Sequence, residues 1–325
     1  MQPFPPFRAP RWLRGGHAQT VVAKLTGARP PPYRRIRWET PDGDFLDTDW
    51  IEPRPGAPLV VLFHGLEGSS RSHYCAALMH AAAARGWNGV VVHFRGCSGE
   101  LNRLPRAYHS GDDTEIDWIL RRLRADQPAA LYAAGVSLGG NALLKWMGMR
   151  GAAACEVIDA AAAVCAPVDL AAAARALEHG FGRVYARYFL RTLKPVALAK
   201  LRRFPGLYPR EAVLAARSLR EFDDAVTAPL HGFRDAADYY ARSSAGPWLS
   251  GIRVPTLMIH AADDPFLPAA ALPRAAELPE GVRLECPQHG GHVGFVSGPF
   301  LGRHEWLPRR LLAFFACRPP GFPAA

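Results

Sequence analysis

The sequence LYAAGVSLGGNALLKW, residues 131–146, decides the fold. It begins with a short apolar run, continues through a glycine-rich turn and ends in a segment of good helix formers, which predicts a strand, a tight turn and a helix. The turn has the pattern G-x-S-x-G, with Ser137 at its apex between Gly135 and Gly139. A residue on so sharp a turn has a strained backbone, and only small residues on either side leave room for the chain to pass.

This turn makes Ser137 a candidate nucleophile. It would lift the serine hydroxyl out of the sheet and direct the first free N–H groups of the helix at negative charge that develops on a substrate carbonyl. The G-x-S-x-G pattern alone is weak, because chance produces it often. The strand and helix around it, and the partner residues described below, strengthen the prediction.

The composition is that of a globular protein. The chain has 325 residues, 49% of them hydrophobic, so it can bury the core of one large α/β domain or two small domains. Its formal net charge is +10, but the arginines are spread along the chain and no nucleic-acid-binding motif accompanies them. We therefore expect a solvated basic surface and no nucleic-acid partner, although such a surface also suits an anionic membrane face or an acidic substrate.

The cysteines and the apolar runs bear on the cellular compartment. Six cysteines are scattered without a C-x-x-C pair, and the N-terminus has no continuous apolar segment of the signal-peptide kind. No run approaches the roughly 18 to 20 apolar residues of a membrane span. The sequence thus predicts a cytoplasmic protein with reduced thiols and with at most peripheral membrane contact, and it gives no indication of an oligomeric state.

The first half of the chain predicts an arm followed by an α/β core. Residues 1–35 are rich in proline and arginine and indicate an extended arm that packs on the body. Residues 36–167 form the first part of the core. They begin with a hairpin around Pro41-Asp42-Gly43 and continue with buried strands at 59–63 and 89–94 on either side of a helix at 73–85. A helix over 112–124, ended by Pro128, precedes the central strand, and another strand is expected at 160–166.

The second half predicts an insertion and a return to the core. Residues 168–250 show helical apolar spacing interrupted by prolines such as Pro195, with many aromatic residues and no convincing strand. We interpret this stretch as a helical cap over the carboxyl edge of the sheet, the alternative being further core helices. Residues 251–325 complete the core with strands at 256–261 and 282–286, a helix at 269–278 between them, and a final helix at 306–316.

A histidine and an acid follow Ser137 in the order expected of a catalytic triad. Asp264 comes just after the strand at 256–261, and His292 lies in the glycine-rich loop HGGHVGF, residues 289–295. Because all three follow strands, they would meet at one edge of the sheet. A serine needs a general base, and the histidine needs a carboxylate to hold its tautomer.

Each partner has a neighbour that competes with it. Asp263 stands beside Asp264, and we favour Asp264 as the acid; His289 precedes His292, and we favour His292 because two glycines give its ring space. The two histidines also suggest a metal, but no further ligand lies at suitable spacing, so we expect neither metal nor cofactor. Cys97 is a weak rival nucleophile, since its loop has no obvious base.

The oxyanion hole is expected at two backbone N–H groups. One belongs to Leu138, which follows the nucleophile, and the other to Leu66 in the segment HGLEGSS, residues 64–70. Each such donor contributes about 3 to 4 kcal/mol in comparable sites. His64 is expected to support this loop structurally.

Seven motifs together show a resemblance to a known family. They are GGHAQT (15–20), HGLEGSS (64–70), HFRGCSGELNR (93–103), YHSGD (108–112), GVSLGGNALLKW (135–146), ADDPF (262–266) and HGGHVGF (289–295). In this order they closely resemble the YheT-like branch of the α/β-hydrolases, which is related to the eukaryotic ABHD1, ABHD2 and ABHD3 lipases and esterases. The resemblance implies an α/β-hydrolase fold, the triad Ser137, Asp264 and His292, and hydrolysis of carboxylic esters, including acyl lipids.

The sequence therefore predicts a serine hydrolase that acts on a small-molecule ester or an acyl lipid through an acyl-enzyme. Acyl transfer or thioester cleavage by the same triad is the first alternative. A binding protein that uses the fold without catalysis is the second, and the intact triad counts against it.

Overall fold

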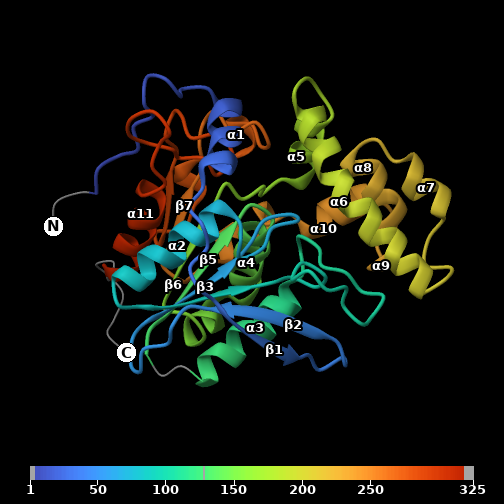
Figure 1. The fold of residues 1–325 in the computed structure, drawn as a ribbon, viewed down its shortest axis with the longest axis horizontal. Coiled ribbons are helices and arrows are strands. Elements are labelled where there is room, and N and C mark those ends of the chain that lie inside the picture. The colour runs from blue at the N-terminus through green and yellow to red at the C-terminus, as the bar shows by residue number, and fades with distance from the viewer. Residues whose placement is uncertain (1–3, 127–128, 318–325) are drawn as a thin grey trace.

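A computed structural model describes residues 4–126 and 129–317 of the chain, so Pro128, expected to end a helix, lies outside the described residues. The described part forms one mixed sheet with helices on both faces and a helical insertion beside it (Figure 1). Its strands are β1 (Arg34–Glu39), β2 (Phe45–Trp50), β3 (Leu59–Phe63), β4 (Asn88–Val92), β5 (Leu131–Val136), β6 (Ala160–Val164), β7 (Thr256–Ile259) and β8 (Val282–Glu285).

The strand order is β1-β2-β4-β3-β5-β6-β7-β8. β1 and β2 form the predicted antiparallel hairpin, and β2 also pairs antiparallel with β4. The other strand pairs are parallel, so β4, β3, β5, β6, β7 and β8 all run in the same direction. Phe63 of β3 lies beside Gly135 of β5. Their carboxyl ends therefore lie along one edge of the sheet, which is where the loops that carry the candidate residues begin.

Helices cover both faces of the sheet. The helices of the core are α1 (Gly16–Thr26), α2 (His73–Ala84), α3 (Asp113–Asp126), α4 (Leu138–Arg150) and α11 (Trp306–Ala316). All five residues of β3 are buried, because alternate side chains pack against α3 and α4 on one face and against α2 and α11 on the other. This explains why the strand is continuously apolar.

The insertion lies between β6 and β7, to the right of the sheet in Figure 1. It contains α5 (Leu170–Leu177), α6 (Gly182–Arg203), α7 (Arg210–Ala215), α8 (Leu219–Phe222), α9 (Ala228–Leu230) and α10 (Ala236–Ser243). Small apolar clusters of its own hold these helices together, one of them around Tyr208 and Phe222. None of the described helices is long and apolar enough to cross a membrane.

Three local predictions were wrong. The expected helix at 269–278 is a pair of short 3-10 turns, Ala269–Ala271 and Ala275–Glu277, because Pro273 between them lacks the N–H that a helix needs. The arm is not simply extended, since α1 occupies Gly16–Thr26. Pro195 lies inside α6 instead of interrupting it; it is exposed, so the carbonyl that loses its partner can be solvated.

Candidate active site

The turn between β5 and α4 holds Ser137 in a strained conformation, with φ 51° and ψ −119°. A Cβ atom on Gly135 would lie 2.5 Å from the carbonyl oxygen of Gly139, and one on Gly139 would lie 2.5 Å from the carbonyl oxygen of Phe63. Both positions therefore exclude any larger residue. The strain and the two glycines present the serine hydroxyl at the carboxyl edge of the sheet.

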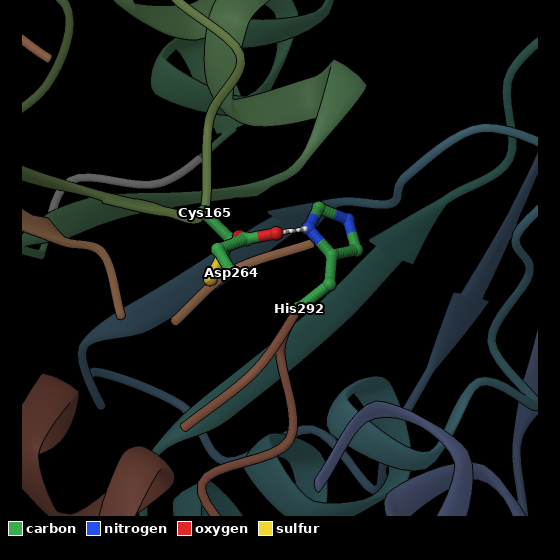
Figure 2. Close-up of side chains that lie close together, drawn as sticks. All are labelled: Cys165, Asp264 and His292. Carbon is green, nitrogen blue, oxygen red and sulfur yellow. Dashed lines mark hydrogen bonds and ion pairs between the residues drawn. The ribbon is translucent and has the colours of Figure 1, made fainter. Parts of the chain in front are cut away.

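His292 and Asp264 lie next to this serine. His292 Nε2 is 3.0 Å from Ser137 Oγ, and His292 Nδ1 is 3.0 Å from Asp264 Oδ2 and 3.2 Å from Oδ1. Figure 2 shows the carboxylate directed at the imidazole, with Cys165 behind it. A carboxylate on Nδ1 favours the tautomer with its proton on that nitrogen, which leaves Nε2 free to accept the serine proton.

Asp264 is held as a charged group inside the protein. Its side chain has no exposed surface, and its Oδ1 also accepts a 2.8 Å hydrogen bond from the N–H of Phe266. Burial acts to raise the pKa of this carboxyl, but the adjacent His292 and the backbone donor outweigh burial and lower it. The ring of Phe266 stacks on that of His292 with centroids 4.0 Å apart, which restricts the orientation of the imidazole.

The competing residues form a separate pair. Asp263 Oδ2 lies 3.2 Å from His289 Nδ1, and Asp263 Oδ1 accepts a 2.8 Å hydrogen bond from the N–H of Gly291. His289 is 42% exposed, whereas His292 is 11% exposed in its side chain. The two aspartates thus point to different histidines, and Asp263 braces the loop that carries His292.

Two tyrosines arrange the loop that contains Leu66. The N–H of Gly65 donates to Tyr74 Oη at 2.9 Å, and the N–H of Glu67 donates to Tyr108 Oη at 2.9 Å. Burial raises the pKa of both tyrosines, so both hydroxyls stay protonated near neutral pH. Within the described residues, the N–H of Leu66 has no hydrogen-bond acceptor, although both of its neighbours have one.

Leu138 and His64 are the other residues expected to form or to support the oxyanion hole. The N–H of Leu138 begins α4 and has no acceptor within residues 4–126 and 129–317. His64 is fully buried; its Nδ1 lies 2.8 Å from the carbonyl oxygen of Gly65, and its Nε2 accepts a 3.1 Å hydrogen bond from the N–H of Phe94. Burial lowers the pKa of His64 to about 3, so it is a neutral structural bridge between the two loops.

The N-terminal helix α1 supports the loop that carries His292 through hydrogen bonds to its backbone. Thr20 Oγ1 accepts a 2.8 Å hydrogen bond from the N–H of His292 and donates to the carbonyl oxygen of Gly16 at 2.7 Å. The buried Gln19 holds the end of the loop: its amide oxygen accepts from the N–H of Val296 at 2.8 Å, and its amide nitrogen donates to the Val296 carbonyl at 3.0 Å. Residues 1–35 thus provide part of the site.

A cavity of about 170 Å³ extends from Ser137 and His292 into the insertion. Its wall on the insertion side is mainly apolar and is lined by Leu170, Leu177, Leu193, Val196, Phe222, Val226 and Leu230. An apolar cavity that opens at a serine hydroxyl suits an acyl chain.

A metal does not fit the groups around the triad. Cys165, Asp264 and His292 offer ligand atoms within 4.8 Å of one another. Burial raises the pKa of the Cys165 thiol well above its usual range, so it remains a thiol, which is a poor ligand, and its sulfur already accepts the N–H of Val293 at 3.4 Å. The other two residues bind each other.

Sequence reasoning did not assign a role to Thr20, Tyr108 or Phe266. A signal for each was present, because each lies within one of the motifs that carry the family resemblance: GGHAQT, YHSGD and ADDPF. Tyr74 lies outside those motifs and gave no signal. Cys97, the rival nucleophile, is half-buried, and desolvation raises the pKa of its thiol well above its usual range, which disfavours the reactive thiolate.

Comparisons with known proteins agree with this fold. Residues 58–299 match the family model described as alpha/beta hydrolase fold. Among solved structures, the esterase EaEST from Exiguobacterium antarcticum superposes with a TM-score of 0.56 at 18% identity, covering 87% of this chain and all 100% of that one. A membrane phospholipase A described as a bacterial virulence factor superposes with a TM-score of 0.55 at 15% identity, over 92% of this chain and 89% of that one. At these identities the likeness concerns the fold alone.

Two relatives narrow the assignment. The chain is 46% identical over 303 residues to the Escherichia coli protein YheT, a provisionally named esterase, covering 91% of this chain and 88% of that protein. It is 29% identical over 310 residues to the human phospholipase ABHD3, covering 92% of this chain and 75% of that protein. Together with the family model and the fold, these matches show that the chain belongs to the YheT-like branch of the α/β-hydrolase family.

Proposed function

We propose that the protein is a serine hydrolase that cleaves carboxylic esters with apolar acyl chains through an acyl-enzyme. The observation that carries the proposal is the row of three side chains: Ser137 Oγ lies 3.0 Å from His292 Nε2, and His292 Nδ1 lies 3.0 Å from the buried Asp264. The names of an esterase and a phospholipase among the relatives support the same chemistry.

The proposed reaction follows from the geometry. His292 Nε2 takes the hydroxyl proton as Ser137 Oγ attacks the ester carbonyl carbon, and Asp264 stabilises the imidazolium that forms. The N–H groups of Leu66 and Leu138 donate to the oxyanion of the tetrahedral intermediate. When this intermediate collapses, the alcohol leaves with the proton from His292. Water then attacks the acyl-enzyme in the same way and releases the acid.

The insertion serves as the cap in this proposal, and its apolar wall holds the acyl chain. The substrate class is an ester or acyl lipid, and the triad requires no cofactor. The proposed location is the cytoplasm, where buried thiols such as Cys75 and Cys165 stay reduced.

Labelling and turnover test the nucleophile. Wild-type protein and Ser137→Ala are treated with a fluorophosphonate, the adduct is mapped by mass spectrometry, and p-nitrophenyl esters of graded chain length are assayed in parallel. We expect an adduct on Ser137 and loss of turnover in the variant. A wild-type protein that is neither labelled nor active would support the non-catalytic binding protein instead. Product analysis with an added alcohol or with thioester substrates separates hydrolysis from acyl transfer and thioester cleavage.

The two adjacent aspartates supply a matched control for the relay. Asp264→Asn places an amide on His292 Nδ1 and favours the wrong tautomer, so kcat should fall by about 10⁴-fold. Asp263→Asn changes the same functional group one residue earlier but contacts His289, so we expect a loss of less than about tenfold together with a lower Tm. Equal losses in kcat for the two variants would contradict the assignment of Asp264.

A further inference from the structure

The excess of basic over acidic residues in the chain lies in two stretches that contain no acidic residue. Residues 1–38 carry eight basic residues and no acid, and residues 179–210 carry another eight and no acid. The chain has 39 basic and 29 acidic residues in all, so the remainder carries 23 basic against 29 acidic residues. The net charge of +10 therefore comes entirely from these two stretches.

The fold brings the two stretches together. The first contains α1 and the second contains α6, and His17 Nδ1 of α1 lies 3.1 Å from Tyr185 Oη of α6. His17 also packs on Phe181, with ring centroids 4.7 Å apart, and Lys24 Nζ lies 3.6 Å from the centre of the Tyr188 ring. In Figure 1, α1 packs on the core beside the insertion, so the contacts between α1 and α6 join the core to the insertion.

Large apolar side chains are exposed on α1 and on the loop after β8, which contacts α1 through His304 and Thr26. Leu25 on α1 is 78% exposed, and in the loop after β8 Phe300 is 78% and Leu301 is 66% exposed. The loop joins the arm through Trp12, whose ring lies 5.5 Å from that of Phe300. We call this surface the basic apolar face, and it consists of Trp12, Arg14, Val21, Lys24, Leu25, Phe181, Val184, Arg187, Tyr188, Arg191, Phe300 and Leu301.

The cations of this face are not neutralised by the protein. Within the described residues, Arg14, Arg187 and Arg191 form no salt bridge, in contrast to Arg35 and Arg37, which pair with aspartates of the hairpin. Exposed apolar side chains surrounded by free cations are the composition of a protein surface that inserts into the headgroup region of an anionic bilayer.

The face adjoins the catalytic residues. Tyr185, which contacts His17, packs on Phe266 with ring centroids 4.8 Å apart, and Phe266 stacks on His292 at 4.0 Å. A chain of three contacts, from His17 to Tyr185, from Tyr185 to Phe266 and from Phe266 to His292, thus connects this region to the general base. A surface bound to the face would lie close to the boundary between the insertion and the core.

We propose that the basic apolar face docks the enzyme on an anionic lipid surface. The proposal extends the proposed function, because it names a membrane as the source of an acyl-lipid substrate, but the binding itself does not require catalysis. A second copy of the chain fits less well, since a twofold contact would set one acid-free basic face against another. A nucleic acid would bind the cations but would leave the protruding leucines without an apolar partner.

The test is flotation of the full-length protein with vesicles. We expect binding to vesicles of phosphatidylcholine mixed with phosphatidylglycerol, little binding to pure phosphatidylcholine, and weaker binding as salt rises from about 50 to about 500 mM. Replacing Arg14, Arg187 and Arg191 by Glu should reduce binding at least about tenfold. The matched control reverses the charge of three exposed arginines outside the acid-free stretches, Arg217, Arg220 and Arg253, and should bind almost as well as the wild type.

The apolar contribution is tested in the same way. Phe300→Ser with Leu301→Ser should weaken binding at least about fivefold, because two exposed apolar side chains no longer enter the bilayer. Leu214→Ser with Met149→Ser removes two other exposed apolar side chains and should leave binding unchanged. Tm and hydrolysis of a short, water-soluble ester should stay at wild-type values in all four variants.

Three results would overturn the docking proposal. The first is no binding of the wild type to anionic vesicles at low salt. The second is equal loss in the face variants and in their controls. The third is that the face variants leave vesicle binding unchanged and alter another property instead. A change only in sedimentation without lipid would assign the face to self-association, and a change only in binding to an oligonucleotide would assign it to nucleic acid. A protein that floats with vesicles but hydrolyses no ester would refute the proposed function and leave the docking proposal intact.

Discussion

At the scale of single residues, the orientation of His292 depends on a threonine from the far end of the chain. Thr20 Oγ1 accepts the N–H of His292 at 2.8 Å, while Asp264 and Phe266 constrain its ring. The backbone and the ring of His292, the proposed general base, are thus held by different segments. An imidazole must keep its geometry closely to move a proton, so losing one of these contacts should affect kcat more than KM.

Substitution of Thr20 separates this contact from simple packing. Thr20→Val keeps the shape of the side chain but cannot accept the hydrogen bond, so we expect kcat to fall about tenfold with little change in KM. Thr20→Ser keeps the hydroxyl and should restore most of the activity. Thr26→Val is the control, because Thr26 lies on the same helix, donates to the Val22 carbonyl at 2.9 Å and contacts His304 instead of His292.

Kinetics with p-nitrophenyl esters, pH–rate profiles and Tm would measure these effects. We expect Thr20→Val to lower kcat across the whole pH profile, whereas Thr26→Val should leave the profile unchanged. If both valine variants lose the same activity and the same Tm, Thr20 acts only through the stability of α1.

The sequence predicted the proximity of Ser137, Asp264 and His292 better than it predicted the residues that support them. Ser137, Asp264 and His292 each follow a predicted strand, and parallel strands bring such loops to one edge, so their proximity was predictable. The choice of Asp264 over Asp263 had no comparable signal, because adjacent residues differ only in the direction of their side chains. The role of Tyr74 depends on a contact between segments that no local pattern encodes. Thr20 lies in a motif of the family resemblance, but that motif does not indicate its contact with His292.

At the scale of elements too, features with a local pattern were predictable from the sequence, and features that depend on contacts between segments were not. Elements with a strong apolar pattern, such as the continuous apolar run of β3 and the amphipathic α11, have the bounds expected from the sequence within a residue or two. Two of the three errors occurred in short segments: α1 packs against the loop that carries His292, and Pro273 divides an apolar stretch into two turns. The third concerned Pro195, which the long helix α6 accommodates. The position of β2 beside β4 had no local signal either, because strand order follows from packing of the whole sheet.

The cavity wall formed by α6 gives a prediction on chain length. Val196 lines the cavity, so Val196→Phe should fill part of it and lower kcat/KM for long-chain esters at least about tenfold while sparing short ones. Val184→Phe adds the same volume on the same helix at a position that is 48% exposed, and it should change neither. Ester panels of graded chain length would measure this; an equal loss for short and long chains in Val196→Phe would show that the cavity does not hold the acyl chain.

At the scale of the whole molecule, Asp49 joins the hairpin, the parallel sheet and the loop of the expected oxyanion hole. Its carboxylate accepts two hydrogen bonds from Arg35 of β1, at 2.7 and 2.8 Å. His93 Nε2, just after β4, lies 2.9 Å away, and Ser70 donates from the end of the Leu66 loop at 2.6 Å. Burial acts to raise the pKa of Asp49, but these partners outweigh burial and hold it far below its usual range.

This shift sets the direction of the pH dependence. The unfolded chain takes up a proton on Asp49 near its ordinary pKa of about 3.9, whereas the folded protein does so only at much lower pH. The contribution of Asp49 to the free energy of unfolding is therefore complete near neutral pH and decreases as the pH falls below about 5.

Asp49→Asn should lower the free energy of unfolding by about 3 kcal/mol near neutral pH, because the buried His93 and Ser70 lose a charged acceptor. The difference from the wild type should begin to shrink below about pH 5 and should be clearly smaller near pH 3, where the unfolded chain is mostly protonated at Asp49 and the wild type has lost part of this contribution. Urea unfolding at several pH values would measure both, with the exposed Glu52→Gln as the control for loss of one negative charge. A difference that stays constant from neutral to acidic pH would mean that Asp49 stabilises the fold by its shape and hydrogen bonds, and that its charge does not link the hairpin to the site.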